Sequence, residues 1–296
     1  MAQADLLLPQ WASLASDRQK FILQQLTRYF LSPLLSVDAL VPVSVDYFGQ
    51  TLNTFDTLIG GQWLRFVPGA MQVPLGVDRD DAATKTLLAQ LPEAELSPKR
   101  YVDIPPMLVA RQAIPVNEQV IGQVNLLTQV FRGNHFAYVP YKPTVMTLLN
   151  RHAQSLDPNA QSWPPILESG HVRLIQQSPH HYQVRLVHDW DAQALTKALG
   201  GFGQTLPNED QYEYLQGGGL AQVFPWGNQL VDELPPYLPN RFGLTVKTND
   251  ASPELLLVGP DKRGEGLLQW SPAYRSLHDA PFAQHTYRPV TLITVD

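Results

Sequence analysis

The sequence predicts an α+β fold that is rich in irregular loops and begins with a helical extension. One reason is the content of 26 prolines and 19 glycines in 296 residues, which implies many turns and much irregular backbone. Another is that helical and hairpin patterns occur in short stretches along the same chain. A third is the balance of 44% apolar and 16% charged residues, which is typical of a globular chain with a sizeable core.

The composition also limits the classes of function. A net charge of −6 without a basic stripe argues against nucleic acid as a partner. Cysteine is absent, which excludes disulfides, thiolate metal sites and cysteine nucleophiles. No window approaches the roughly 20 apolar residues of a membrane span, and the N-terminus lacks a secretory pattern. We therefore expect a soluble, cytoplasmic protein with no membrane partner.

Residues 1–55 are assigned as the N-terminal helical extension. Pro33 ends its one clear helix, which Ser16-Asp17 are expected to cap. Residues 38–55 mix β-branched and aromatic side chains and receive no assigned type. The helix either packs on its own domain, the usual role of an amphipathic helix, or docks on a partner. Its apolar residues recur at three-to-four spacing: Phe21, Ile22, Leu26, Tyr29 and Phe30.

From residue 61 onward the pattern changes to strands. Apolar alternation in residues 63–76, around the turn at Pro68-Gly69, predicts a β-hairpin. Residues 78–96 are rich in charge, and we expect a surface loop with a short helix there.

The stretch from Val187 to Asn228 predicts two short helices followed by a stiff aromatic turn. Asp189 or Asp191 caps the first helix, and glycines at 200, 201 and 203 end it. In the second, Asn208 and Gln211 match the two halves of a capping box, and glycines at 217–219 stop it. Three rings are expected to share one buried cluster here: Tyr212, Phe224 and Trp226.

This stretch resembles the family of formylglycine-generating enzymes, also called sulfatase-modifying factors. Residues 206–215 read L-P-N-E-D-Q-Y-E-Y-L, where the family has L-P-T-E-x-E-W-E-Y-A. A glycine pair follows at 217–218, and residues 224–228 read F-P-W-G-N where the family has Y-P-W-G-N. Further stretches that resemble family motifs are residues 63–76, 100–111, 115–120 (a helix start capped by Asn117), 240–244, 263–275 and 287–292.

The resemblance implies a single α+β domain, a formylglycine-generating-enzyme-like variant of the C-type lectin fold. We assign this domain to residues 56–296, with an insertion near 125–182. The family's oxidases bind copper through two cysteines, and related sulfoxide synthases bind iron through an H-x-x-x-H-x-E motif. The chain contains neither feature, and the segments that match the calcium loop, 229–239 and 249–254, lack its ligand pattern. We therefore expect a divergent, cysteine-free member with no catalytic residues, no bound metal and no cofactor.

The first hypothesis for function is a non-catalytic protein that recognises a protein or a small-molecule ligand. Irregular loops held on a rigid frame suit such a role. The resemblance places the binding cleft in the C-terminal region. For Trp270 the alternative is a core position, and for Arg288 it is an ion pair with a framework carboxylate. The candidate ligand-binding residues are Arg263, Trp270, Tyr274, Arg275, His278 and Arg288.

The second hypothesis is an iron-dependent oxidase or oxygenase with a site of histidines and carboxylates. Three imidazoles, or two with a carboxylate, would have to converge on one point. His180 and His181 are adjacent, so on a strand they would point to opposite sides, which argues against a shared metal. The possible ligands are His135, His171, His180, His188, His278, His285, Glu209, Glu213 and Asp279.

Overall fold

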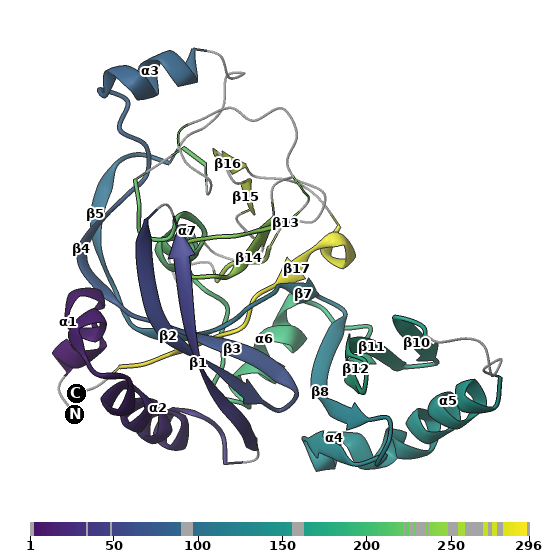
Figure 1. Cartoon of the computed structure of the whole chain (residues 1–296). Coiled ribbons are helices and arrows are strands. Elements are labelled where there is room, and N and C mark those ends of the chain that lie inside the picture. Colours follow the sequence, from purple (N-terminus) through teal and green to yellow (C-terminus); the bar gives the residue numbers. More distant parts are fainter. Residues whose placement is uncertain are drawn as a thin grey trace.

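The computed structural model combines helices with several antiparallel sheets, which confirms the predicted α+β class (Figure 1). None of the helices in its described part is long and apolar enough to cross a membrane. The structure describes residues 3–33, 35–47, 49–89, 97–155, 163–221, 223–224, 228, 235, 237–247, 254–257, 269–271, 274–276 and 281–294.

The N-terminus is helical only as far as Phe30. It comprises the 3-10 turn η1 (Gln3–Leu6) and the helices α1 (Leu8–Ser13) and α2 (Ser16–Phe30). Helix α2 forms where the apolar spacing predicts it, but its N-cap is Ala15, whose side chain makes no capping bond. Asp17 lies in the first turn instead, where its carboxylate interacts favourably with the positive end of the helix dipole.

Only part of the predicted apolar stripe of α2 is buried. Ile22 and Leu26 pack into the core, whereas Phe21 is 52% exposed and Tyr29 is 72% exposed. Residues follow one another at about 100° around a helix, so Phe21 lies opposite the arc that carries Ile22 and Leu26. The expectation that all five apolar residues pack on the domain is therefore wrong for Phe21 and Tyr29.

Residues 37–59 form a β-hairpin rather than more helix, and the expected boundary at residue 55 falls inside its second strand. Their β-branched and aromatic content favours strands. The hairpin belongs to a five-stranded antiparallel sheet with the order β1-β2-β3-β6-β18. The bounds of its strands are β1 (Val37–Tyr47), β2 (Gln50–Ile59), β3 (Gln62–Val67), β6 (Met107–Ala110) and β18 (Val290–Leu292).

The two strands of the predicted 63–76 hairpin form but do not pair with each other. β3 pairs with β2 and β6, while β4 (Ala70–Leu75) pairs with β5 (Arg100–Ile104). The turn at Gly69 is instead joined to the N-terminal segment, since its N–H donates to Leu6 and its carbonyl accepts from Leu8. The short helix expected within residues 78–96 is α3 (Ala82–Leu88), capped by the Asp81 side chain.

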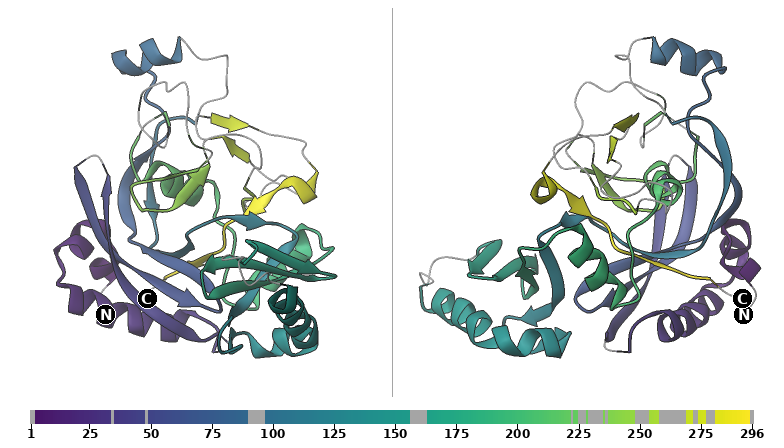
Figure 2. Two further views of the ribbon diagram at one scale, coloured as in Figure 1. Left: turned by 45° about the vertical axis from the view of Figure 1, so that its right-hand side comes forward. Right: turned by 180° about the vertical axis from the view of Figure 1, so that it is seen from behind.

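A second five-stranded sheet, with the order β10-β11-β12-β8-β9, lies on the side of the molecule away from α1 and α2 (Figure 2). Here the expected helix start at 115–120 is wrong: Asn117 caps no helix, and the segment opens strand β8. Pairing along the whole of β12 decides this conformation. The elements are β8 (Glu118–Asn125), β9 (Phe131–Gly133), α4 (His135–Tyr138), η2 (Val139–Tyr141), α5 (Lys142–Ser155), β10 (Ile166–Ser169), β11 (Val172–Ser178) and β12 (His181–Val187).

The two helices predicted after residue 187 form as expected. Asp191 caps α6 (Ala192–Gly200), and Asn208 with Gln211 makes the predicted capping box of α7 (Glu209–Gly217). The remaining elements are short strands and one turn: β7 (Ile114–Pro115), β13 (Tyr237–Pro239), β14 (Thr245–Lys247), β15 (Gln269–Ser271), β16 (Tyr274–Ser276), η3 (Phe282–Gln284) and β17 (Thr286–Tyr287).

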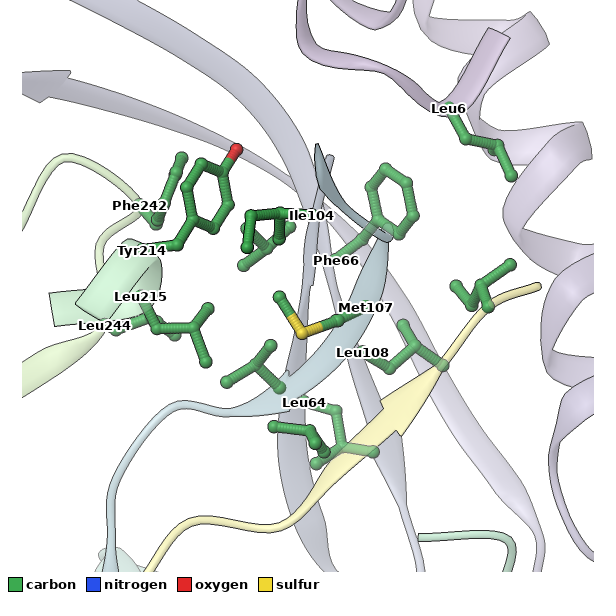
Figure 3. Packing of buried hydrophobic residues seen from close by; sticks show 14 of the residues in the cluster. Leu6, Leu64, Phe66, Ile104, Met107, Leu108, Tyr214, Leu215, Phe242 and Leu244 are labelled. Carbon is green, nitrogen blue, oxygen red and sulfur yellow. The ribbon is translucent and has the colours of Figure 1, made fainter. Parts of the chain in front are cut away.

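The main core covers both faces of the first sheet. Figure 3 shows Tyr214 and Leu215 of α7 on one side of strands β3 and β6, and Leu6 on the other. Every residue of β6 is buried as a result. Tyr214 also anchors α7, because its buried hydroxyl donates to the carbonyl of Pro68 at 2.9 Å.

The aromatic cluster expected around α7 is divided in two. Tyr212 packs with Leu256, whereas Phe224 belongs to a separate cluster near α3. Both rings are buried, as predicted, but the turn after α7 carries Phe224 away from the helix. Trp226, the third expected member, lies outside the described residues.

Candidate functional site

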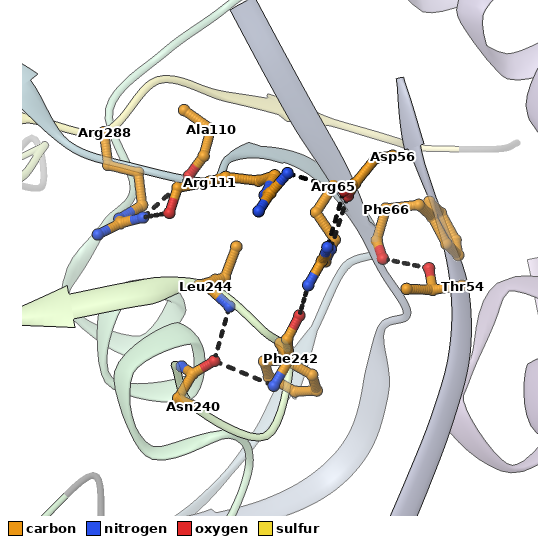
Figure 4. Close-up of polar contacts among 10 residues, drawn as sticks. All are labelled: Thr54, Asp56, Arg65, Phe66, Ala110, Arg111, Asn240, Phe242, Leu244 and Arg288. Carbon is orange, nitrogen blue, oxygen red and sulfur yellow. Dashed lines mark hydrogen bonds and ion pairs between the residues drawn. The ribbon is translucent and has the colours of Figure 1, made fainter. Parts of the chain in front are cut away.

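The framework around the candidate site is held by buried arginines (Figure 4). The Arg65 guanidinium pairs with both carboxylate oxygens of Asp56, at 2.7 and 2.8 Å, and donates to the carbonyl of Phe242 at 3.0 Å. Arg111 approaches the same carboxylate at 3.2 Å. Because Asp56 is buried, these cations compensate a charge that is costly to remove from water.

Asn240 joins the end of α7 to the loop before β14. Its side-chain N–H groups donate to the carbonyls of Leu215 and Gln216, which are among the last turn of the helix and have no intrahelical donor. Its side-chain oxygen accepts from the backbone N–H groups of Phe242 at 3.0 Å and Leu244 at 3.1 Å (Figure 4). One side chain therefore closes the helix and shapes the following loop.

Arg288 lies in the framework and not in an open cleft. It is 1% exposed, and its Nε and Nη2 donate to the two carboxylate oxygens of Glu254 at 3.0 and 2.8 Å. Its other donors reach the carbonyls of Ala110, Arg111 and Thr245 at 2.8–3.0 Å. A guanidinium has five N–H donors, and all five are used here. Arg288 therefore has no free donor for a ligand, and the ion-pair alternative describes its position.

Three other predicted residues meet in one hairpin. Strands β15 and β16 pair so that Trp270 lies opposite Arg275 and Tyr274 lies opposite Ser271. The hairpin lies at the same end of the molecule as α3 and the β13–β14 pair, away from both termini (Figures 1 and 2). The remaining two candidates, Arg263 and His278, lie outside the described residues.

The histidines proposed as metal ligands are spread over several elements. His135, on α4, stands edge-on to Phe131. His180 precedes strand β12, and the buried His285 ring contacts the carbonyl of Pro281. Over the described ranges, no three histidine or carboxylate side chains are grouped so as to hold a metal. His278 and Asp279 fall outside those ranges.

The predicted carboxylate Glu213 takes part in a surface ion-pair cluster. It accepts from Arg100 at 2.9 Å and from the Ser97 hydroxyl at 2.8 Å, and it also accepts from the backbone N–H of Gly76. Asp210 shares the Arg100 guanidinium. Glu213 thus ties α7 to strands β4 and β5, while Glu209 is simply the first residue of the helix.

His188 belongs to a small polar group that the sequence does not reveal. Its ring stacks on Trp190 with a centroid separation of 4.3 Å, and its Nε2 lies 3.1 Å from the side-chain oxygen of Gln119. Burial lowers the pKa of His188 below the usual 6.5, and the positive charge of a protonated His171 lowers it further. The imidazole is therefore held in its neutral form. Gln119 is 69 residues away in sequence, so no local motif signals this contact.

Comparison with protein-family models, with characterised proteins and with solved structures gave no match. Function is therefore inferred from the residues and their contacts.

Proposed function

We propose that this chain is a non-catalytic recognition protein whose binding surface is centred on the β15–β16 hairpin. The observation that carries the proposal is the strand register, which sets Trp270 opposite Arg275 and Tyr274 opposite Ser271 within one short hairpin. Tryptophan, tyrosine and arginine dominate the energetics of protein recognition surfaces. Arg263 and His278 flank the hairpin in sequence.

The scaffold is, in our proposal, a formylglycine-generating-enzyme-like variant of the C-type lectin fold. Two of the stretches that carry the resemblance contact each other directly. Residues 206–215 form the capped start of α7, and Asn240 of the 240–244 stretch donates to Leu215 at the end of that match. This contact supports the proposed scaffold because both stretches take part in the structure around one helix, α7.

Buried polar contacts join the described segments that precede and follow the hairpin in sequence. Arg288 connects the C-terminal segment to β6 through Ala110 and to β14 through Thr245, with Glu254 completing its partners. Binding residues on irregular segments need such a support, because a mobile surface loses conformational entropy when it binds. The Arg288–Glu254 pair, in which both side chains are buried, provides such a support.

The test uses the full-length protein on arrays of peptides and of glycans. Wild-type protein should select discrete ligands, and the double variant Trp270→Ala/Arg275→Ala should lose at least about 30-fold in affinity for them, as expected for two interface hot spots. Arg79→Ala/Tyr101→Ala is the matched control, since it removes an exposed arginine and an exposed aromatic ring elsewhere.

The control variant should bind like the wild type, and thermal melting should verify that all three proteins are folded. Equal binding by the hairpin variant and the wild type would overturn the placement of the site. Turnover of an array ligand would overturn the non-catalytic assignment.

A further inference from the structure

A small cavity lies where the two five-stranded sheets meet. Its volume is about 40 Å³, and it is bounded by the β2–β3 turn at Gly60, by β8, by α6 and by the C-terminal segment at Tyr287 and Pro289. The cavity is separate from the β15–β16 hairpin, none of whose residues lines it.

Two glycines bring the sheets together beside this cavity. A Cβ atom on Gly61 would come within 2.2 Å of the backbone of Gly122. With a larger residue at position 61, the two sheets could therefore not lie this close together. Gly61 also has a φ of +79°, which glycine adopts without strain. The side-chain nitrogen of Gln183 then donates to the carbonyl of Gly61 at 2.9 Å, which fixes the junction.

The wall of the cavity combines polar amides with an apolar part to which Leu35, Leu195 and Leu199 belong. Four carboxamide residues line it: Gln62, Gln119, Gln204 and Asn134. Aromatic residues add apolar surface: Trp190, Phe202 and Tyr287. Among the described residues, no lysine, arginine, aspartate or glutamate lines the cavity. A charged ligand would lose its hydration there without gaining a counter-charge, which is strongly unfavourable.

Several of these amides have hydrogen-bonding capacity to spare. Asn134 is 8% exposed, and its side-chain oxygen caps α4 through the N–H of Ala137 at 3.1 Å, while its side-chain nitrogen donates to no described residue. The side-chain amides of Gln62 and Gln204 likewise bond to none of the described residues. Buried polar groups in folded proteins nearly always have a partner, so the amide nitrogen of the buried Asn134 favours a ligand that accepts a hydrogen bond. Gln62 and Gln204 are only partly buried, so a ligand there would replace water at their amides.

Gln119 is oriented by its neighbours. Its side-chain oxygen faces Nε2 of His188, which leaves its two N–H groups as donors. The lowered pKa of His188 keeps that ring neutral, so the wall of the cavity stays free of charge near neutral pH.

We propose that this cavity binds a small neutral carboxamide. A primary amide both donates and accepts hydrogen bonds. It therefore matches the N–H and C=O groups of Gln62 and Gln204 and the free N–H groups of Asn134. Size agrees as well. A cavity of about 40 Å³ suits a ligand of only a few heavy atoms. The planar amide would lie against the aromatic part of the wall.

The test is a titration of the full-length protein with acetamide, followed through the indole N–H resonance of Trp190. Trp190→Phe identifies that resonance. Acetamide should shift it along a saturable curve, with a dissociation constant no tighter than about 40 µM for four heavy atoms. Acetate, which is charged, and acetone, which only accepts hydrogen bonds, should bind at least tenfold more weakly.

Variants give an independent readout. Gln62→Leu and Gln204→Leu should each weaken acetamide binding at least tenfold, whereas Gln193→Leu, an exposed residue on α6, should leave it unchanged. Trp270→Ala/Arg275→Ala should also bind acetamide normally, so failure at the hairpin and failure at the cavity are distinguishable.

A linear, non-saturating shift, or equal binding of the three probes, would show that the cavity holds water only and would overturn the proposal. The probe series needs only wild-type protein, so it decides the matter even where a variant does not fold.

Discussion

Arg288 and Glu254, which are 34 residues apart in the chain, form a bidentate ion pair whose side chains are 1% and 2% exposed. We expect Arg288→Met to destabilise the protein by about 3–5 kcal/mol, because it leaves the Glu254 carboxylate buried without its cation. Equilibrium denaturation in urea measures this. Arg79→Met, at an exposed position, should change the free energy of unfolding by less than about 0.5 kcal/mol. A cost below about 1 kcal/mol for Arg288→Met would show that the pair does not hold the frame.

Truncating a buried side chain and an exposed side chain of α2 should have very different effects on the free energy of unfolding. Leu26 is fully buried, so Leu26→Ala should cost about 2–5 kcal/mol through lost burial and an unfilled cavity. Tyr29→Ala, on the exposed face of the same helix, should stay within about 0.5 kcal/mol. Comparable losses for the two variants in thermal or urea denaturation would contradict the packing observed here.

Deleting residues 1–36 removes η1, α1 and α2 together. Trp11, Ile22, Leu23 and Leu26 are buried in the main core, so we expect the shortened chain to be poorly soluble or to melt at a much lower temperature. Size-exclusion chromatography and a melting curve measure this. A soluble product with an unchanged melting curve would instead favour the helix as a docking element for a partner.

The protonation of His188 gives a pH-dependent prediction. Its pKa in the folded protein lies below that of an unfolded histidine, so the unfolded state binds more protons between the two values. Stability from this group is therefore complete above pH 6.5 and decreases as the pH falls through the lower, folded value. An NMR titration of the imidazole should give a midpoint below 6.5, and His171→Gln should raise it partway. A midpoint at or above 6.5 would contradict the burial of this ring.

Oxidase chemistry is expected to be absent. Cu(I) prefers thiolate and thioether ligands, and the chain offers no cysteine and only four methionines. Protein purified without chelator should contain neither copper nor iron in stoichiometric amount by elemental analysis. It should also leave a cysteine-containing peptide unchanged under air, as judged by mass spectrometry. Stoichiometric iron, or an aldehyde product, would favour the enzyme hypothesis over recognition.

Elements with complete local signals could be predicted from the sequence. Asn208 and Gln211 lie three residues apart, and they form the capping box of α7 from contacts within the helix itself. Asp191 likewise caps α6. In each case the partners are neighbours in sequence, so spacing alone determines the contact. The absence of cysteine and the α+β class follow from composition and pattern in the same way.

Tertiary structure decided the elements whose local signals were ambiguous. Asn117 matches a helix cap, yet the following residues pair with β12, some 65 residues later, and become strand β8. Pro68-Gly69 matches a hairpin turn, yet β3 pairs with β6 because the turn is bonded to Leu6 and Leu8 instead. Long-range strand pairing satisfies the backbone N–H and C=O groups of these segments, and the spacing of residues within a segment does not show which strand will supply the partners.

Some properties of the candidate site also follow from the sequence, whereas others depend on the tertiary structure. The sequence by itself determined which residue types are present: a C-terminal set of arginines and aromatic rings, and no thiol. Only the tertiary structure decided that Arg288 is buried against Glu254, and that Gln62, Gln119 and Gln204 surround one cavity. The physical reason is that a guanidinium or an amide has the same hydrogen-bonding capacity everywhere. Which partner uses that capacity depends on segments that meet only when the chain folds.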